Sequence, residues 1–536
     1  MVPKHFRYLI DFGLAVLSAV LLVVSFPKFD LGFLAWIGLL PILIASNGKS
    51  LKYSFILWFL CGLFFFGGVF YWTFAIPKYT VLHHSLLGLY LPPYFAFFGL
   101  AFAFISKRWG VRPALSAAPF LWVSLEYVRS NLSFMALPWA LLAHSQYQYP
   151  VIIQIASVTG TYGLSFLIVL VNAAIVQMLI IRRTLRTGSA GLKNSTPWTR
   201  ARLVLPGAAA ILLILALGYG QNELSEPAEK RFIKASVLQG NINQERKADP
   251  RRHAPYIMDR YTELTTSAAL DEPDLIVWPE GATPGFILKD VTLYQRMISI
   301  VREINTYLLV GSSEYAKFRK TLPKDKRARS GNTALFFSPE GKILGQYLKI
   351  QLVPFGEYIP LEGVIEWPHF ILSKEGKSYD TPGQEHTLFS LKETKFGVVI
   401  CWEHVFPDLF RTFVKNGANF MLNITNEGWF GDTAAPYQML AISVFRAVEN
   451  RRAIARAANT GISCFVDPYG RITGRVQDRH KKDTFIEGYL TGEIPIWNHK
   501  TFYTKHGEVF AYLCIAIALL MVAIPFARGK KANRKG

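Results

Sequence analysis

Long apolar runs alternate with short polar segments over the first 220 residues of the chain. Most of these runs are long enough to cross the hydrocarbon core of a bilayer as a helix. A mainly polar segment follows, and one more apolar run comes after it. The pattern predicts a membrane domain over 1–220, a polar domain over 221–505, and a last span with a basic tail over 506–536. The predicted spans are 8–26, 30–46, 53–75, 86–105, 114–142, 162–181, 201–219 and 508–527.

Two of the eight predicted spans have unusual features. The fifth is interrupted by Glu126, Arg129 and Pro138. Intramembrane charge that could form an ion path is scarce, with Glu126 the main candidate, which argues against a transporter. The first follows Lys4 and Arg7, as the core of a signal peptide does. It is longer than a typical signal core and lacks a small-residue cleavage site, so we expect it to be retained.

The distribution of positive charge predicts the orientation of the spans. Eighteen lysines and arginines lie at the termini and in alternate loops, whereas the opposite loops hold three, Lys28, Lys78 and Arg129. Positively charged loops stay in the cytoplasm. We therefore expect both termini in the cytoplasm and the polar domain on the outer side of the membrane.

The composition limits the remaining classes. Apolar residues make up 51% of the chain and charged residues 18%, which suits a membrane part joined to a water-facing part. The net charge of +21 lies largely beside apolar runs, which argues against nucleic-acid binding. The four cysteines show neither a disulfide framework nor the spacing of metal ligands, and we expect no metal or cofactor. Cys61, Cys464 and Cys514 are predicted to be packed core thiols.

The polar domain has the pattern of an α/β enzyme, with short β-branched runs separated by helix-like stretches. Turns with hairpin character are predicted at 338–341 and 467–470. The basic run 317–329 is interpreted as a solvated loop. Strands are predicted near 233–238, 275–278, 308–310, 334–337, 397–400 and 420–424, and helices near 293–304, 407–414 and 436–457.

Cys401 is the first candidate for chemistry. It ends the apolar run at 396–400 and precedes a predicted helix, where a turn can expose the sulfur and nearby N–H groups can lower the thiol pKa. A buried cysteine at a strand end is the alternative interpretation. Glu280 also ends an apolar strand, although a solvated loop residue fits that position as well. Lys349 and Glu357 lie in an aromatic, apolar stretch, where buried charges must be paired or shifted in pKa.

Glutamate, lysine and cysteine at the ends of three strands form a coherent catalytic set. The carboxylate can act as general base, and the ammonium can face a developing oxyanion together with the N–H that follows the cysteine. The cysteine can carry an acyl group as a thioester.

The motifs around these residues resemble the nitrilase, or carbon–nitrogen hydrolase, superfamily. They are Trp278-Pro-Glu280, Tyr347-Leu-Lys349, the stretch 353–360, Ile400-Cys-Trp-Glu403, the stretch 423–431, and the stretches 446–452 and 456–461. With the flanking spans, the whole chain is similar to the apolipoprotein N-acyltransferases, which join such a domain to a bundle of membrane helices.

This resemblance implies a four-layer αββα sandwich, with Glu280 as base, Lys349 as oxyanion stabiliser and Cys401 as nucleophile. Glu357 and Glu403 match supporting carboxylates. Three positions depart from the family pattern. Trp402 replaces a tyrosine, Asn426-Glu-Gly-Trp-Phe430 replaces Asn-Asp-Ala-Trp-Phe, and the loop 245–249 lacks a tryptophan. The first two changes preserve the chemistry, whereas the third affects expected lipid contacts.

The resemblance predicts acyl transfer from a phospholipid, through a Cys401 thioester, to the α-amino group of the diacylglyceryl-cysteine of an apolipoprotein. A membrane-anchored amidase with the same triad is the alternative, although an amidase needs no bundle of spans. A transporter or an inactive scaffold is less compatible with three occupied triad positions. A Cys–His site through His253, His386 or His404 is also less favoured, and these histidines are interpreted as surface residues. His83 and His84 have no matching metal ligands.

Overall fold

The computed structural model describes residues 4–77, 79–186, 203–225, 231–315, 330–368 and 380–532. The chain divides into two compact units. Unit 1 comprises Met1–Phe74, Tyr79–Glu226 and Glu508–Gly536, and unit 2 comprises Ala75–Lys78 and Pro227–Gly507. The basic run 317–329 and several charges used to predict the orientation lie outside the described residues, namely Lys78, Lys193, Arg200, Arg202, Arg534 and Lys535.

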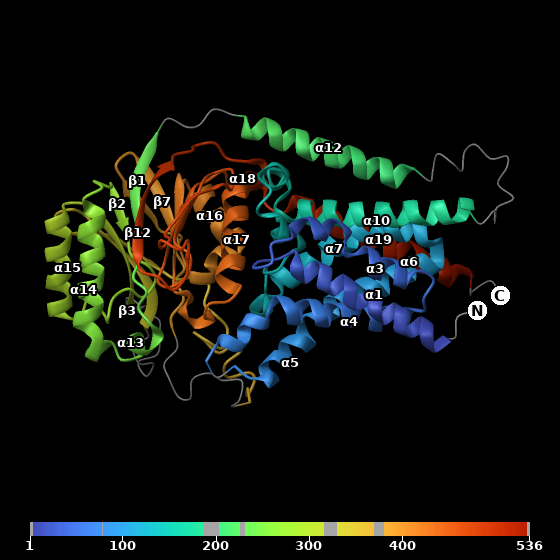
Figure 1. Cartoon of the computed structure of the whole chain (residues 1–536), viewed down its shortest axis with the longest axis horizontal. Helices are drawn as coiled ribbons and strands as arrows, with labels where there is room; N and C mark the ends of the chain where they lie inside the picture. Colours follow the sequence, from blue (N-terminus) through green and yellow to red (C-terminus); the bar gives the residue numbers. More distant parts are fainter. Residues whose placement is uncertain are drawn as a thin grey trace. The chain divides into compact units, whose positions relative to one another are not determined.

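Unit 1 is a bundle of helices (Figure 1). Five helical segments in the described residues are long and apolar enough to cross a membrane: His5–Val24, Leu51–Val69, Val81–Trp109, Thr161–Arg182 and Val204–Leu224. Gly32–Ser46 and Val509–Ile524 are shorter apolar helices. The main helices are α1 (Lys4–Val24), α2 (Ala35–Gly38), α3 (Leu40–Ser46), α4 (Leu51–Val69), α5 (Val81–Tyr90), α6 (Pro92–Trp109), α7 (Val111–Asn131), α8 (Pro150–Ile153), α9 (Ala156–Thr159), α10 (Thr161–Arg186), α12 (Val204–Leu224) and α19 (Val509–Ala532).

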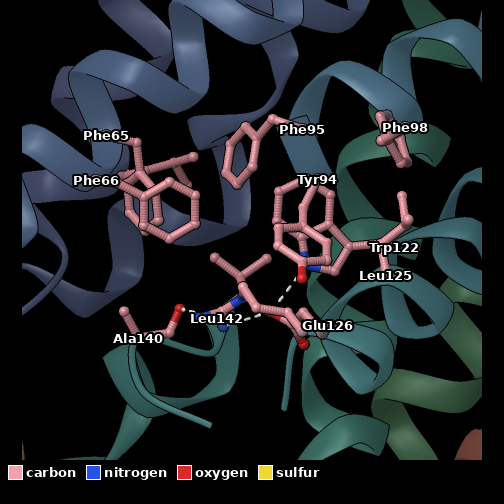
Figure 2. Close-up of a pocket in the computed structure, with 12 residues that line it drawn as sticks. Phe65, Phe66, Tyr94, Phe95, Phe98, Trp122, Leu125, Glu126, Ala140 and Leu142 are labelled. Carbon is pink, nitrogen blue, oxygen red and sulfur yellow. Dashed lines mark hydrogen bonds between the residues drawn. The ribbon is translucent and has the colours of Figure 1, made fainter. Parts of the chain in front are cut away.

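The predicted fifth span ends earlier than expected, because α7 stops at Asn131. Two charged side chains then hold the irregular segment that follows. Glu126 Oε1 accepts hydrogen bonds from Trp122 Nε1 at 3.0 Å and from the Leu142 N–H at 2.8 Å (Figure 2). Arg129 donates to the carbonyls of Leu137 at 3.0 Å and Trp139 at 2.7 Å. These buried charges therefore satisfy backbone groups that leave the helix, as irregular backbone in an apolar bundle requires.

Unit 2 contains two six-stranded sheets, each with a helix pair on its outer face (Figure 1). Helices α14 and α15 cover one sheet, and α16 and α17 cover the other. Rings from the two sheets meet between them, as in the edge-to-face pair of Phe336 and Phe396, whose centroids lie 5.2 Å apart. The four layers confirm the αββα sandwich predicted for this part of the chain.

The first sheet has the order β12-β1-β2-β3-β4-β5, and the second has the order β11-β10-β9-β8-β7-β6. Neighbours β1, β2 and β3 run parallel, as do β7, β8 and β9. The strands are β1 (Phe232–Gln239), β2 (Leu275–Val277), β3 (Tyr307–Tyr315), β4 (Ser330–Phe337), β5 (Ile343–Leu348), β6 (Leu388–Leu391), β7 (Thr394–Ile400), β8 (Phe420–Thr425), β9 (Ile454–Ala458), β10 (Cys464–Val466), β11 (Ile472–Arg475) and β12 (Gly488–Pro495). The helices are α13 (Gln244–Ala248), α14 (Pro250–Ala269), α15 (Val291–Ile304), α16 (Pro407–Lys415), α17 (Ala435–Asn450) and α18 (Phe502–His506).

The helix predicted over 436–457 is wrong in its last part. Helix α17 ends at Asn450, and Arg451 adopts the left-handed conformation with φ of 48°. The chain then enters β9, which pairs with β8 and β10 inside the second sheet. Both predicted hairpin turns are confirmed, since β4 and β5 flank 338–341 and β10 and β11 flank 467–470.

Candidate active site

Glu280, Lys349 and Cys401 each follow the end of a strand. Lys349 and Cys401 come directly after β5 and β7, and Glu280 comes three residues after β2. The Lys349 ammonium lies 3.7 Å from Glu280 Oε1 and 2.7 Å from Glu357 Oε1. The structure therefore brings two carboxylates and an ammonium together, and Cys401 lies near enough to Lys349 to interact with it electrostatically.

Lys349 is completely buried. Burial favours the neutral amine, but the carboxylates of Glu357 and Glu280 favour the ammonium more strongly. The net effect raises the pKa of Lys349 above its ordinary value. Lys349 is consequently a fixed positive charge in a site that water reaches poorly.

Glu280 is held by the loop after β8. Its Oε2 accepts a hydrogen bond from the Asn426 N–H at 2.8 Å. Burial raises the pKa of Glu280, and the Lys349 ammonium opposes that rise. Lys247 donates to the backbone carbonyls of Glu280 at 3.3 Å and Gly281 at 3.0 Å. Burial lowers the pKa of Lys247 to about 8.

Cys401 opens a 3-10 helix, η6 (Cys401–Val405), and has φ of 54°. This left-handed conformation is uncommon for a residue with a side chain. Burial and the Glu280 carboxylate raise the pKa of the Cys401 thiol to about 12. Less than one thiol in about 10⁴ is therefore ionised at neutral pH, so the sulfur needs a base to remove its proton as it reacts.

Glu357 and Glu403 hold the loop between β5 and β6 in different ways. Glu357 accepts from Asn332 Nδ2 at 3.1 Å and from the Val353 N–H at 2.8 Å, besides its pair with Lys349. Glu403 is completely buried, and burial raises the pKa of its carboxyl to about 7. Glu403 accepts hydrogen bonds from the N–H groups of Ile350, Gln351 and Ile400 at 2.6, 2.9 and 2.7 Å, and from the hydroxyl of Tyr347 at 2.9 Å.

Glu403 therefore joins the turn at Cys401 to the backbone that follows Lys349. Trp402 adds a second link, because its Nε1 donates to the Gln351 carbonyl at 2.8 Å. Neither side chain needs to touch a substrate to affect the relative position of the lysine and the cysteine.

His404 corrects the expectation of a surface histidine, because it is completely buried. Its Nδ1 lies 2.8 Å from the Cys401 carbonyl oxygen, and its Nε2 lies 3.1 Å from the Met439 carbonyl oxygen. Burial, followed by the Arg456 charge, lowers the pKa of His404 to about 3. With both nitrogens turned to carbonyls, the ring cannot take the thiol proton. Cys61, Cys464 and Cys514 are buried, as predicted.

Several residues of the site were not predicted from the sequence. Asn332 lies in no motif that the sequence analysis recognised, and Lys247, Asn423 and Asn426 lie in matched stretches but were given no role there. In the part of the chain that the structure describes, no group of three or more His, Cys, Asp or Glu residues is arranged to hold a metal ion.

Comparison with known proteins connects this site to a family. The model of the apolipoprotein N-acyltransferase N-terminal domain matches residues 18–174, and that of carbon-nitrogen hydrolase matches residues 234–495. An apolipoprotein N-acyltransferase of Geobacter metallireducens is 35% identical over 526 residues, which cover 97% of this chain and 96% of that protein. The chain belongs to the apolipoprotein N-acyltransferase family.

More distant relatives match the chain over the same extent. Apolipoprotein N-acyltransferases of Chlorobaculum tepidum and Thermotoga maritima are each 29% identical. These matches cover 96% and 98% of this chain, and 97% and 96% of the relatives. Membership of the apolipoprotein N-acyltransferase family makes the chain an enzyme and a membrane protein, and it leaves the amidase alternative with less support.

Proposed function

We propose that this enzyme transfers a fatty acyl chain from a phospholipid to the α-amino group of the diacylglyceryl-cysteine at the N-terminus of an apolipoprotein. Cys401 carries the acyl group between the two substrates as a thioester. The observation that carries this proposal is the buried Lys349 ammonium beside Glu280, next to a thiol that needs a base, in a chain that matches the family over nearly its whole length.

In the first half-reaction, Glu280 takes the thiol proton as Sγ of Cys401 attacks the ester carbonyl of the phospholipid. The carbonyl oxygen becomes negative, and the Lys349 ammonium and the Trp402 N–H stabilise that charge. The C–O bond then breaks. Glu280 returns the proton to the departing oxygen, which leaves a lysophospholipid and the Cys401 thioester.

In the second half-reaction, the free α-amine of the apolipoprotein attacks the thioester carbonyl. Glu280 accepts the proton that the amine loses, the same two donors stabilise the oxyanion, and the C–S bond breaks. The proton on Glu280 then returns to the sulfur. The products are the N-acylated lipoprotein and the free thiol, so the site is restored without a cofactor.

We further propose that the enzyme lies in the bacterial inner membrane, with both termini in the cytoplasm and unit 2 on the outer side. The excess of lysine and arginine at the termini and in alternate loops supports this orientation. A site on the outer side of the membrane suits two lipid-bearing substrates.

The test is intact-mass analysis of the detergent-purified enzyme after incubation with a defined phospholipid. We expect an added acyl mass on the native chain and none on Cys401→Ala. A diacylated lipopeptide with a free α-amine should then accept the acyl group, so the enzyme loses the added mass and the lipopeptide gains it. Cys464→Ala is the matched control, because Cys464 is a completely buried thiol in the same unit, and this variant should still be acylated.

A native chain that gains no acyl mass, with a lipopeptide that stays diacylated, would refute acyl transfer. If the same preparation hydrolysed small amides, the amidase alternative would replace it. An acyl group that persists on Cys401→Ala would show that the nucleophile is another residue.

A further inference from the structure

The backbone carbonyl of Cys401 is held by two side chains that the acyl-transfer chemistry does not use. Asn423 Nδ2 donates to this oxygen at 3.2 Å and to the Val399 carbonyl at 3.1 Å. His404 Nδ1 lies 2.8 Å from the same oxygen, closer than Nε2 lies to the Met439 carbonyl. The neutral ring carries one N–H, and the shorter contact assigns it to Nδ1.

Asn423 is itself fixed by a charged side chain. Asn423 on β8 and Arg456 on β9 are direct partners in the parallel register, and the Arg456 guanidinium donates to Asn423 Oδ1 at 2.7 Å. The same guanidinium donates to the Ile462 carbonyl at 3.1 Å and to the Ser443 hydroxyl at 3.2 Å. Its remaining nitrogen forms an ion pair with Glu427. The oxygen of the Asn423 amide therefore faces Arg456, and its NH₂ group must face Cys401.

This chain of contacts is completely buried. Asn423, Arg456, Glu427 and His404 all have exposed fractions of 0%. A buried ion pair is weak evidence for stability, since removing two charges from water offsets much of their attraction. Such a pair does fix geometry, because the planar guanidinium directs each of its donors. Here the fixed geometry ends at the residue that adopts the left-handed conformation, Cys401.

The peptide bond between Cys401 and Trp402 connects these contacts to the reaction. A trans peptide is planar, so its C=O and N–H point in opposite directions. Asn423 and His404 anchor the C=O on one side, and this fixes the direction of the Trp402 N–H on the other. The Trp402 N–H lies in the first turn of η6, where a helix leaves its N–H groups without a partner in the helix.

The geometry points to Asn423 and His404 as positioning residues that orient the Cys401–Trp402 peptide, so that the Trp402 N–H faces the oxyanion, with Arg456 and Glu427 fixing Asn423. This assignment rests on the proposed acyl transfer. It predicts that loss of these contacts slows a reaction of Cys401 that forms an oxyanion and does not slow a reaction of the thiol that forms none.

Asn423→Asp tests this prediction in the full-length enzyme. The aspartate keeps an acceptor for Arg456 and loses the donor to the Cys401 carbonyl. Two rates are compared in the same preparation: acylation of Cys401 by phospholipid, followed by intact mass, and alkylation of Cys401 by iodoacetamide, which forms no oxyanion. We expect acylation to fall about 10²-fold, as when one oxyanion donor is lost, and alkylation to stay within about threefold.

Asn450→Asp is the matched control, because Asn450 is also completely buried and donates to a carbonyl, that of Arg446. It should lower the melting temperature and leave the ratio of the acylation rate to the alkylation rate unchanged. His404→Leu is the second variant, and it decides the question if Asn423→Asp does not fold. It should slow acylation while sparing alkylation.

Unchanged acylation, or an equal fall in both rates, would overturn the assignment and leave these residues with a purely structural role. A native enzyme that alkylates at Cys401 and never acylates would instead refute the proposed function.

Discussion

Lys349→Met removes the positive charge that pairs with Glu280 and Glu357 at the candidate site. The Lys349 ammonium is completely buried and lies 2.7 Å from one carboxylate and 3.7 Å from the other. Breaking a buried ion pair by removing one partner costs about 3–5 kcal/mol, because a charge remains buried without compensation. Methionine fills a similar volume, so a cavity adds little to this cost.

The Glu280 carboxyl can reduce that cost by binding a proton. Burial raises its pKa and the Lys349 ammonium opposes that rise, so loss of the ammonium should raise the pKa of Glu280 further. Glu280 of Lys349→Met should therefore hold its proton to higher pH than Glu280 of the native enzyme. A carboxyl whose folded-state pKa is raised stabilises the fold below its unfolded pKa, and that contribution is lost as pH rises through the folded pKa.

The assay is thermal melting of the detergent-purified enzyme between about pH 5 and pH 8. At pH 8 we expect the variant to melt roughly 6 °C or more below the native enzyme, given about 2–4 °C per kcal/mol for a unit of this size. The difference should shrink toward pH 5. Acylation of Cys401 should fall at least about 10²-fold at every pH, because an oxyanion donor is lost.

Lys392→Met is the matched control for this change. Lys392 pairs with Asp274 in the same unit, but its side chain is 56% exposed. An exposed pair contributes about 0–1 kcal/mol, so this variant should have the melting temperature of the native enzyme at every pH. If Lys349→Met also had the melting temperature of the native enzyme at pH 8, the electrostatic account of the site would be refuted.

Two further predictions concern the base and the buried ion pair. The initial rate of Cys401 acylation in the native enzyme should increase as pH rises through the raised pKa of Glu280 and then stay level to about pH 9. The rate stays level because the Cys401 thiol titrates only near its pKa of about 12. A second increase in the initial rate near pH 8.5 would contradict reaction through Glu280. Gly461→Ala should lower stability by about 3 kcal/mol or more, because the new Cβ would overlap the carboxylate of Glu427. Gly285→Ala meets only ordinary contacts and should melt within about 2 °C of the native enzyme in the same thermal assay, and a similar result for Gly461→Ala would contradict this prediction.

The strands before Glu280 and Cys401 could be predicted from the sequence, whereas β5, which precedes Lys349, was not among the predicted strands. The runs before Glu280 and Cys401 are apolar and of strand length, and each is followed by a residue whose side chain can take part in catalysis. The end of α17 has no such mark. Arg451 takes the left-handed conformation without a glycine, and the following residues keep a spacing that also fits a helix. The sheet decides the conformation there, because β9 lies between β8 and β10.

The buried polar contacts could not be predicted for a different reason. His404 looks like a surface residue beside a glutamate, and its burial depends on Met439, thirty-five positions further along the chain. The contact of Asn423 with Arg456 depends on the register of two strands, which the apolar pattern constrains only to within one face of the sheet. Sequence identifies groups that can react, whereas the groups that orient them are set by tertiary pairing.

The charges of the site explain why acyl transfer can proceed where water is scarce. The Lys349 ammonium faces two carboxylates, Glu280 and Glu357, near the thiol. Burial, followed by the Glu280 carboxylate, raises the pKa of Cys401. In the proposed mechanism the thiol proton moves to Glu280, so this carboxylate becomes neutral as the oxyanion forms and the net charge of the site does not change. A low-dielectric site opposes changes in net charge far more than it opposes rearrangement of a constant charge, so we expect proton transfer to Glu280 to accompany the attack of the sulfur.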